Sequence, residues 1–520
     1  MADFGTNSTS ITRQRTFNGH LIDLEKATNS PTHHGDGGTS TPVDHLTLNS
    51  ERRIHQLDEI EAGLTRFWNR FTRKGKKNIG VAATFRAIAF SSWLNLFVVF
   101  IPLAWIGHFV HAFSDTLTFA FCFLALVPLE WLFDWGGEQM AFYLGTQLGD
   151  LVVITLNNIV EATLSIILLT KCELKLLQST VVGVVILHLL LIPGAAFISG
   201  GAMIMHQDLH PHIVQLNHTL LTIGVLSLLL PAAFFSALDR GAGIQLSPEV
   251  SVGNIVNDNT RHIFLVMSRG SAIILLVVYI CSRIFLHNPP GDGNDIRLDS
   301  AAPAAMKEEE KELVVKEPKA NQYVLVVVLI ISIGIMAATT EWLVHSIEFV
   351  RETGEIREEW FGMFLLPIVS WAANGFVAIV YFIRYMFKHF FKRPAPPKEL
   401  AKARAIDLSI QFTLFWMPFL VLLGWWIGKP MSLLFDFFEV AVLLGSCFIV
   451  NYVTADAKTN WVEGFCMVAF YCLIALCAWF YTGQPEIKLL LGGGPKLCGS
   501  VVEALAAFAS GETEGHGGGH

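Results

Sequence analysis

The stretch Leu156–Leu169 reads LNNIVEATLSIILL and places a carboxylate, Glu161, within an otherwise apolar segment. The segment and its flanks are long enough to cross a bilayer, where an ionisable side chain costs about 3 kcal/mol on insertion scales. A chain that keeps a carboxylate at this depth generally needs it for an ion, a proton or a substrate. The stretch therefore predicts a membrane-spanning helix with a functional Glu161.

Two amides precede this carboxylate. Asn157 and Asn158 lie four and three residues before Glu161, so in a continuous helix all three side chains share nearly one face. Amide and carboxylate oxygens are hard ligands suited to a calcium- or sodium-like cation. The alternative is an interhelical polar clamp, because intramembrane asparagine also joins helices. We expect these residues to bind an ion, and the interhelical clamp is the alternative interpretation.

The composition agrees with a membrane protein. The chain has 520 residues, is 52% hydrophobic and 15% charged, and has a mean hydropathy of +0.50, which is too apolar for an ordinary soluble protein. Its net charge of −8 shows no basic excess that would indicate nucleic acid. The eight cysteines lack the spacing of a metal site, and we interpret them as packing residues.

The apolar runs predict an all-α polytopic membrane protein with about eleven transmembrane helices. They fall near residues 87–110, 116–134, 146–169, 176–199, 214–237, 263–286, 322–346, 361–386, 405–427, 432–454 and 461–481. If the first helix is an addition, two repeats of five remain. An odd number of spans per repeat requires the second repeat to be inverted, an arrangement common in secondary transporters.

Polar segments divide the chain into five parts. These are a disordered or amphipathic arm (1–80), a first half (86–286), an acidic linker (287–321), a second half (322–482) and a Gly-rich tail (483–520). In the arm, ERRIHQLDEIEAGLTRFWNRF could form an amphipathic helix. Lysine and arginine concentrate before the first helix and between the eighth and ninth. The positive-inside rule therefore predicts a cytoplasmic N-terminus and linker.

Several long strings resemble one known family. They are FSSWLNLFVVFIPLAWIGHF from Phe90, PLEWLFDWGGEQMAFYLG from Pro128, MSRGSAIILLVVYI from Met267, MPFLVLLGWWIGKPMSLLFDFFE from Met417 and VNYVTADAKTNWVEG from Val450. In this order, over roughly residues 85–482, the chain resembles the cation/proton exchanger (CAX) family of the calcium/cation antiporter superfamily, particularly its fungal members. The resemblance implies two inverted five-helix repeats with an ion site between them. It also implies calcium uptake into vacuoles in exchange for protons.

The family's signature motifs are altered here. In the GNxxE-like motif of the third span, Asn157 replaces glycine, while Asn158 and Glu161 are kept. In the GNAAEH-like motif of the eighth span, the second carboxylate is missing. The altered positions of that motif are Ser370, Trp371, Asn374 and Gly375.

Two further spans show partial matches. A GSSLQ-like motif of the ninth span keeps Ser409 and Gln411 but has Asp407 for glycine. A GSILSN-like motif of the fourth span ends in His188 where the family has asparagine. The resemblance therefore implies cation binding by Glu161 with Asn157, Asn158, Asn374, Ser409 and Gln411.

The missing carboxylate of the eighth span matters because the negative charge of the site must balance the charge of the bound cation. Buried calcium normally requires at least two carboxylates, so Glu161 alone favours a monovalent cation or no transport, whereas family resemblance favours calcium. Asp150, His188 and Asp407 are candidates to carry a proton or to line the mouth of the ion path. The alternative for Asp150 is an ordinary acid at a helix end, and the alternative for His188 is a histidine held by structural hydrogen bonds. Trp371 could narrow the ion path, with its N–H bonded to Ser370 or Asn374.

These observations lead to one expectation and one rival. We expect a cation/proton antiporter of the vacuole or another acidic endomembrane, with inorganic cations, protons and the lipid bilayer as its partners, without a cofactor or enzymatic activity. The rival is a non-transporting regulatory or structural relative whose ion site has decayed.

Overall fold

The computed structural model describes residues 65, 67–72, 79–110, 113–201, 206–242, 256–287, 300–304, 307, 317–354, 356–368, 371, 404–492 and 498–509. Most of the predicted arm and acidic linker, and with them the predicted amphipathic helix up to residue 64, lie outside these residues. Within residues 65–520 the described chain is almost entirely helical. The only strands there are β1 (Gln207–Asp208) and β2 (Lys458–Thr459), which pair antiparallel.

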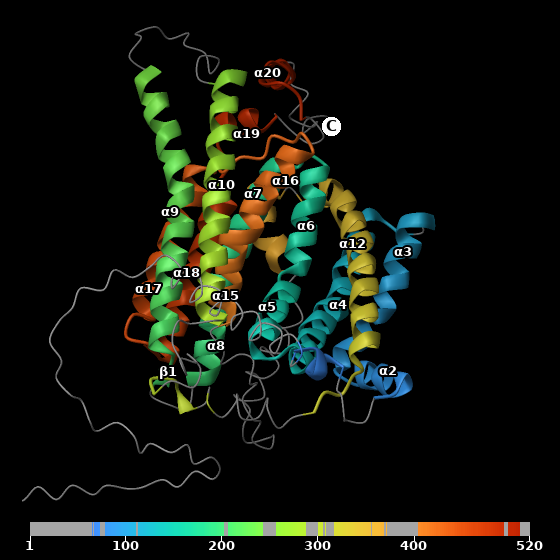
Figure 1. The fold of residues 1–520 in the computed structure, drawn as a ribbon. Helices are drawn as coiled ribbons and strands as arrows, with labels where there is room; N and C mark the ends of the chain where they lie inside the picture. Colours follow the sequence, from blue (N-terminus) through green and yellow to red (C-terminus); the bar gives the residue numbers. More distant parts are fainter. Residues whose placement is uncertain are drawn as a thin grey trace, which may run out of the picture. The chain divides into compact units, whose positions relative to one another are not determined.

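The helices follow one another in the order expected from the apolar runs (Figure 1). In the first half they are α2 (Val81–Ala89), η1 (Trp93–Val99), α3 (Phe100–Val110), α4 (Asp115–Leu144), α5 (Thr146–Asn157), α6 (Ile159–Thr170), α7 (Leu174–Ile186), η2 (Leu187–Leu191), α8 (Ile192–Gly201), α9 (Pro211–Ala242) and α10 (Asp258–His287). In the second half they are α12 (Gln322–Thr353), α13 (Glu358–Trp360), η4 (Phe361–Leu365), α15 (Arg404–Gln411), η5 (Phe412–Trp416), α16 (Met417–Trp426), α17 (Phe437–Val453), α18 (Trp461–Trp479), α19 (Pro485–Leu491) and α20 (Val501–Ala509).

The described residues contain eight helices long and apolar enough to cross a membrane, and a ninth span if α5 and α6 are counted as one broken helix. The apolar helix α17 occupies the expected tenth position but is shorter. The expected eighth span, near 361–386, lies mostly outside the described residues. The polytopic helical fold is therefore confirmed, and the count of eleven and the inverted repeats stay predictions.

Two helix boundaries differ from the expectation. The run near 87–110 is divided, because Asn95 donates its side-chain amide to the Ile88 carbonyl (2.7 Å) and closes a corner between α2 and η1. The predicted span near 116–134 continues through the whole of α4 to Leu144. Polar residues such as Glu130 and Asp134 hid this continuation in the sequence, because they are buried inside the fold.

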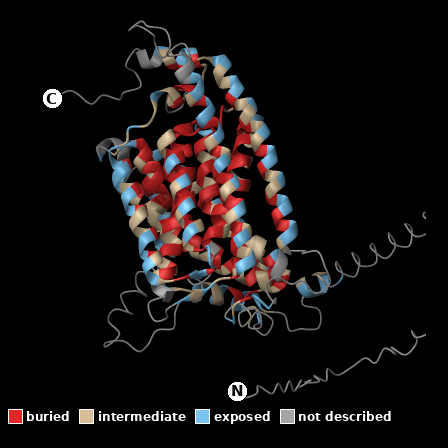
Figure 2. Cartoon of the chain, turned by 90° about the vertical axis from the view of Figure 1, so that its left-hand side faces the viewer, coloured by how far each residue is buried: buried red, intermediate tan, exposed pale blue. Residues whose placement is uncertain are grey.

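The core is centred on α7. All 13 residues of Leu174–Ile186 are buried, and buried residues gather inside the bundle while exposed ones follow its outer faces (Figure 2). At Gly183 an added Cβ would collide with the Met363 backbone, so glycine allows α7 and η4 to cross in direct contact. Outward-facing apolar side chains, such as Leu230 (70% exposed) and Phe448 (68% exposed), suit a lipid environment.

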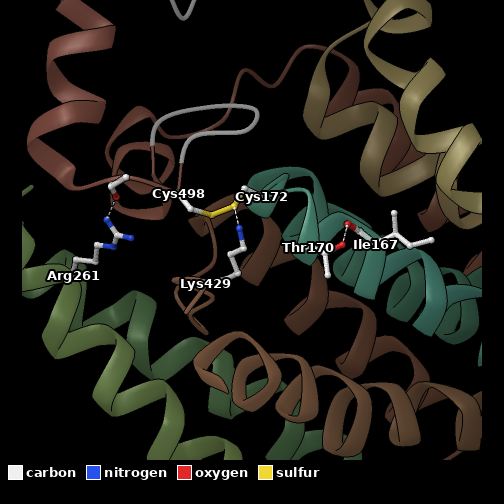
Figure 3. Close-up of a disulfide and its surroundings, with 7 residues drawn as sticks. Ile167, Thr170, Cys172, Arg261, Lys429 and Cys498 are labelled. Atoms are coloured by element: carbon white, nitrogen blue, oxygen red, sulfur yellow. Dashed lines mark hydrogen bonds between the residues drawn. A yellow bond between two sulfur atoms is a disulfide. The ribbon is translucent and has the colours of Figure 1, made fainter. Parts of the chain in front are cut away.

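A disulfide corrects the interpretation of two cysteines. Cys172, just after α6, is bonded to Cys498 in the C-terminal segment (Figure 3). Nearby, Arg261 of α10 donates to the Gly499 carbonyl (2.6 Å), and Asp258 accepts from the backbone N–H of Val501 (2.9 Å). The predicted Gly-rich tail therefore includes α19 and α20, and a covalent bond holds it against the end of α6. Sequence spacing could not reveal a pair separated by 326 positions.

Candidate functional site

The third span is broken beside its carboxylate. α5 and α6 meet at Asn158 with a bend of 51°, where the backbone has φ −91° and ψ 3°. Asn157 ends one helix and Glu161 lies in the first turn of the next. The predicted continuous face shared by the three residues is therefore wrong, because that prediction assumed an unbroken helix. The break instead places Glu161 at a helix N-terminus, where the backbone dipoles favour negative charge.

Asn158 connects this break to α15. Its Nδ2 donates to Gln411 Oε1 (2.7 Å) and to the Leu408 carbonyl (3.3 Å). Gln411 in turn donates from Nε2 to Thr155 Oγ1 (3.0 Å). Asn158 is fully buried, and among the described residues its Oδ1 has no hydrogen-bond partner. The amide thus joins two helices, as the clamp interpretation requires, and also keeps one buried oxygen available to a ligand.

Glu161 lies beside His188. The Glu161 and His188 side chains are 3% and 5% exposed, and Glu161 Oε1 is 3.9 Å from His188 Nε2. His188 Nδ1 lies 2.9 Å from the Val184 carbonyl, and a carbonyl can only accept, so Nδ1 carries hydrogen. Nε2 is therefore the nitrogen that gains or loses a proton next to Glu161. The π-helical turn η2 contains His188, and such turns are frequent at functional sites.

The remaining predicted ligands in the described part of the chain lie around the same helices. Ser409 is fully buried and donates to the Val185 carbonyl (3.4 Å), one turn before His188. Asn157 is half-buried, and its Oδ1 has no partner in the described residues. α15 packs against α5, η2 and α7. The structure therefore brings Asn158, Glu161, His188, Ser409 and Gln411 into one region.

The two predicted mouth residues lie on neighbouring helices. Asp150 is on α5, Asp407 is on α15, and both are half-buried. Each engages in a polar interaction. Nothing tests a role in ion entry, so their assignment as mouth groups stays a prediction.

The altered eighth-span motif is described at a single residue. Ser370, Asn374 and Gly375 lie outside the described residues, and so does any contact between them and Glu161. Trp371 is half-buried and packs against the hydrophobic core. Its Nε1 is buried without a hydrogen-bond partner among the residues described, and its expected acceptors, Ser370 and Asn374, are not among these.

The sequence did not predict a buried cluster of charged side chains. This cluster lies at the same end of the helix bundle as the disulfide. Lys175 Nζ lies 2.9 Å from both Asp436 Oδ2 and Glu439 Oε1. Ser179 also donates to Glu439 Oε1 (2.6 Å), and Tyr481 donates to Asp436 Oδ2 (3.2 Å). Burial raises the pKa of the Tyr481 hydroxyl, and the nearby Asp436 carboxylate raises it further. A lysine directly before the apolar run near 176–199 was the available signal.

A second pair of carboxylates lies at the same end. Glu358 accepts from Lys488 (3.1 Å), and Glu359 beside it is 5% exposed. Burial raises the pKa of Glu359, and the neighbouring Glu358 carboxylate raises it further. In the described residues, here and elsewhere, no three His, Cys, Asp or Glu side chains form a group that could hold a metal ion.

Comparison with known proteins finds relatives that are named as exchangers, transporters or antiporters. The family description "Sodium/calcium exchanger protein" matches residues 324–480. A vacuolar calcium ion transporter of Cryptococcus neoformans var. grubii is 29% identical, over 85% of this chain and 83% of that protein. A Ca2+/H+ antiporter of Aphanothece halophytica is 27% identical, over 75% of this chain and 97% of that protein.

Solved structures show a similar fold. Native YfkE is 21% identical with a TM-score of 0.54, and the match covers 75% of this chain and all of that one. A structure described as an H+/Ca2+ exchanger CAX is 13% identical with a TM-score of 0.50, over 82% of this chain and 98% of that one. At these identities the similarity shows the fold.

Proposed function

Because this chain belongs to the cation/proton exchanger family of the calcium/cation antiporter superfamily, we propose that it exchanges calcium for protons across an intracellular membrane. The observation that carries the proposal is the Glu161–His188 pair, buried at the break between α5 and α6. Half-helix ends at mid-membrane are a recurring form of ion site in secondary transporters. The names of the relatives support calcium as the cation.

The exchange follows from competition at one carboxylate. With a proton on Glu161 or on His188 Nε2, the buried pair carries less negative charge and attracts a cation weakly. When the proton leaves, the Glu161 carboxylate and the Asn158 Oδ1 become oxygen ligands for the cation. Cation binding therefore expels the proton, and proton binding expels the cation. Exposing the pair alternately to the two sides of the membrane couples their fluxes.

The membrane and the orientation are part of the proposal. The relatives' names support a vacuolar membrane, and the positive-inside rule supports a cytoplasmic N-terminus. With a cytoplasmic N-terminus, the third span begins on the cytoplasmic side at the start of α5 and reaches the opposite side at the end of α6. The Cys172–Cys498 disulfide lies at the end of α6 and therefore agrees with this orientation. A disulfide persists in an oxidising compartment and is rare on the cytosolic side.

A second candidate function rests on the eighth-span motif. Asn374 stands where the family has its second carboxylate. Trp371, three residues earlier in the sequence, packs against the hydrophobic core. A site with one motif carboxylate suits a monovalent cation, and a blocked path suits a non-transporting relative.

Ion flux separates these possibilities. Purified protein is reconstituted into acid-loaded vesicles, and internal pH is followed after addition of calcium, sodium or potassium. Calcium-dependent alkalinisation is expected. Alkalinisation by sodium or potassium alone would favour the monovalent antiporter, and no response to any of the three ions would favour the non-transporting relative.

A further inference from the structure

We infer that the Cys172–Cys498 disulfide is a redox switch of the exchanger, which a dithiol opens with the help of Lys429 and which releases α6 from α10 when it opens. The inference rests on the proposed function, because α6 carries Glu161. It starts from contacts that meet at the C-terminal segment: the disulfide itself, the approach of Lys429 to Cys172, and a hydrogen bond from α10 (Figure 3).

Residues 498–501 form a clasp between two helices. At one end of the clasp, Cys498 is bonded to Cys172, two residues after the end of α6. At the other end, Arg261 donates to a backbone carbonyl of the clasp (2.6 Å), and Asp258 accepts from one of its backbone N–H groups (2.9 Å). Arg261 and Asp258 both lie at the start of α10. The disulfide is therefore the covalent half of a link between α6 and α10.

Lys429 lies beside one sulfur of this link. α6 and α10 both pack against α16, and Lys429 follows that helix by three residues. Its Nζ lies 2.9 Å from Cys172 Sγ. A neighbouring positive charge stabilises a thiolate, which is the form in which a sulfur leaves a broken disulfide. The contact therefore favours Cys172 as the leaving sulfur.

Accessibility favours attack on the other sulfur, because Cys498 is half-buried whereas Cys172 is 6% exposed. A thiolate of the dithiol forms a bond to Cys498 Sγ, the bond between the two cysteines breaks, and its electron pair leaves with Cys172 as a thiolate beside Lys429. The second thiol then attacks the mixed disulfide and releases Cys498. The cysteines are reduced, the dithiol is oxidised to an internal disulfide, and its two protons pass through water to the cysteines.

Opening the bond removes a restraint on the candidate site. Glu161 lies in the first turn of α6, and the disulfide holds the opposite end of this helix, about 14 Å away along its axis. Alternating access requires the helices around the site to move relative to one another. A covalent link to α10 limits that movement, so calcium/proton exchange should be slower while the disulfide is closed.

The rate of opening tests the role of Lys429. Purified full-length protein is treated with dithiothreitol and quenched with an alkylating reagent, and the loss of the linked Cys172–Cys498 peptide is followed by mass spectrometry. Lys429→Met should slow opening by about fivefold or more, and Lys429→Arg should keep the rate within about twofold of the native value. Lys171→Met is the matched control: Lys171 is next to Cys172 in the sequence but lies 2.8 Å from Glu341, so this variant should open at the native rate.

Two measurements test the release of α6. After complete opening by dithiothreitol, calcium-dependent alkalinisation of acid-loaded vesicles should be about threefold faster or more. Amide hydrogen exchange at the end of α6, over residues 167–173, should also rise about threefold or more. Cys172→Ser should show the faster flux without dithiothreitol and no response to it. Cys122→Ser removes a buried free cysteine and should respond to dithiothreitol as the native protein does.

A native opening rate in Lys429→Met would overturn the inference, and so would unchanged flux and unchanged amide protection after complete opening. If Lys429→Met does not purify as a folded species, Lys429→Gln replaces it with the same expectation; if Cys172→Ser does not, the reduced native protein takes its place. Native protein that exchanges no calcium in either redox state would instead refute the proposed function, while the opening rates and the amide protection would still test the switch.

Discussion

Replacing Lys175 with methionine should strongly destabilise the protein. The Lys175 side chain is 4% exposed, and its ammonium lies 2.9 Å from two carboxylates, Asp436 and Glu439, that are themselves fully buried. Removing one partner of a buried ion network leaves uncompensated charge and costs about 3–5 kcal/mol. Lys175→Met should lower the apparent free energy of unfolding in a mixed-detergent titration by that amount.

An exposed ion pair provides the control. Lys171 lies 2.8 Å from Glu341, but their side chains are 46% and 52% exposed, so Lys171→Met should cost less than about 1 kcal/mol. The triple variant Lys175→Met, Asp436→Asn, Glu439→Gln should recover part of the loss, since it removes the charges while keeping the polar atoms. Equal losses for the two single variants, or no recovery in the triple variant, would refute the electrostatic reasoning.

Three further predictions concern other parts of the molecule. Asn158→Ala removes two side-chain hydrogen bonds to α15 and should lower the free energy of unfolding by about 1–3 kcal/mol; Asn157→Ala, measured in the same titration, should lower it less. Cys172→Ser should abolish the disulfide-linked peptide in a non-reducing digest and lower stability by about 2–4 kcal/mol, whereas Cys122→Ser should leave the linked peptide intact. Burial raises the pKa of Glu359, so the folded state holds its proton more tightly and loses stability as pH rises from the ordinary carboxyl range. Glu359→Gln should therefore gain stability relative to native protein at pH 7 but not at pH 4, and equal differences at both pH values would contradict this assignment.

Much of the fold could be predicted from hydrophobic periodicity. Apolar runs of bilayer length mark most of the spans, because every backbone polar group in lipid must be satisfied within a helix. The broken third span could not be predicted this way. Ile159 continues the apolar pattern after Asn158, and at the 51° bend Asn158 bonds residues of α15 that lie 250 and 253 positions later in the sequence.

The candidate site was partly predictable. Glu161 stands out as a carboxylate in an apolar run, and its proximity to His188 of the fourth span is observed in the structure. The disulfide and the Lys175 network depend on long-range contacts, which local patterns do not encode.

Proton-coupled calcium flux in vesicles containing Glu161→Gln tests the central claim most directly. Glutamine keeps the shape of the side chain but removes its charge and its exchangeable proton. We predict loss of calcium-dependent alkalinisation in this variant, with normal insertion and folding, while Glu341→Gln at the exposed pair keeps the native rate. Undiminished coupled flux in Glu161→Gln would contradict the account and place the exchange chemistry elsewhere in the protein.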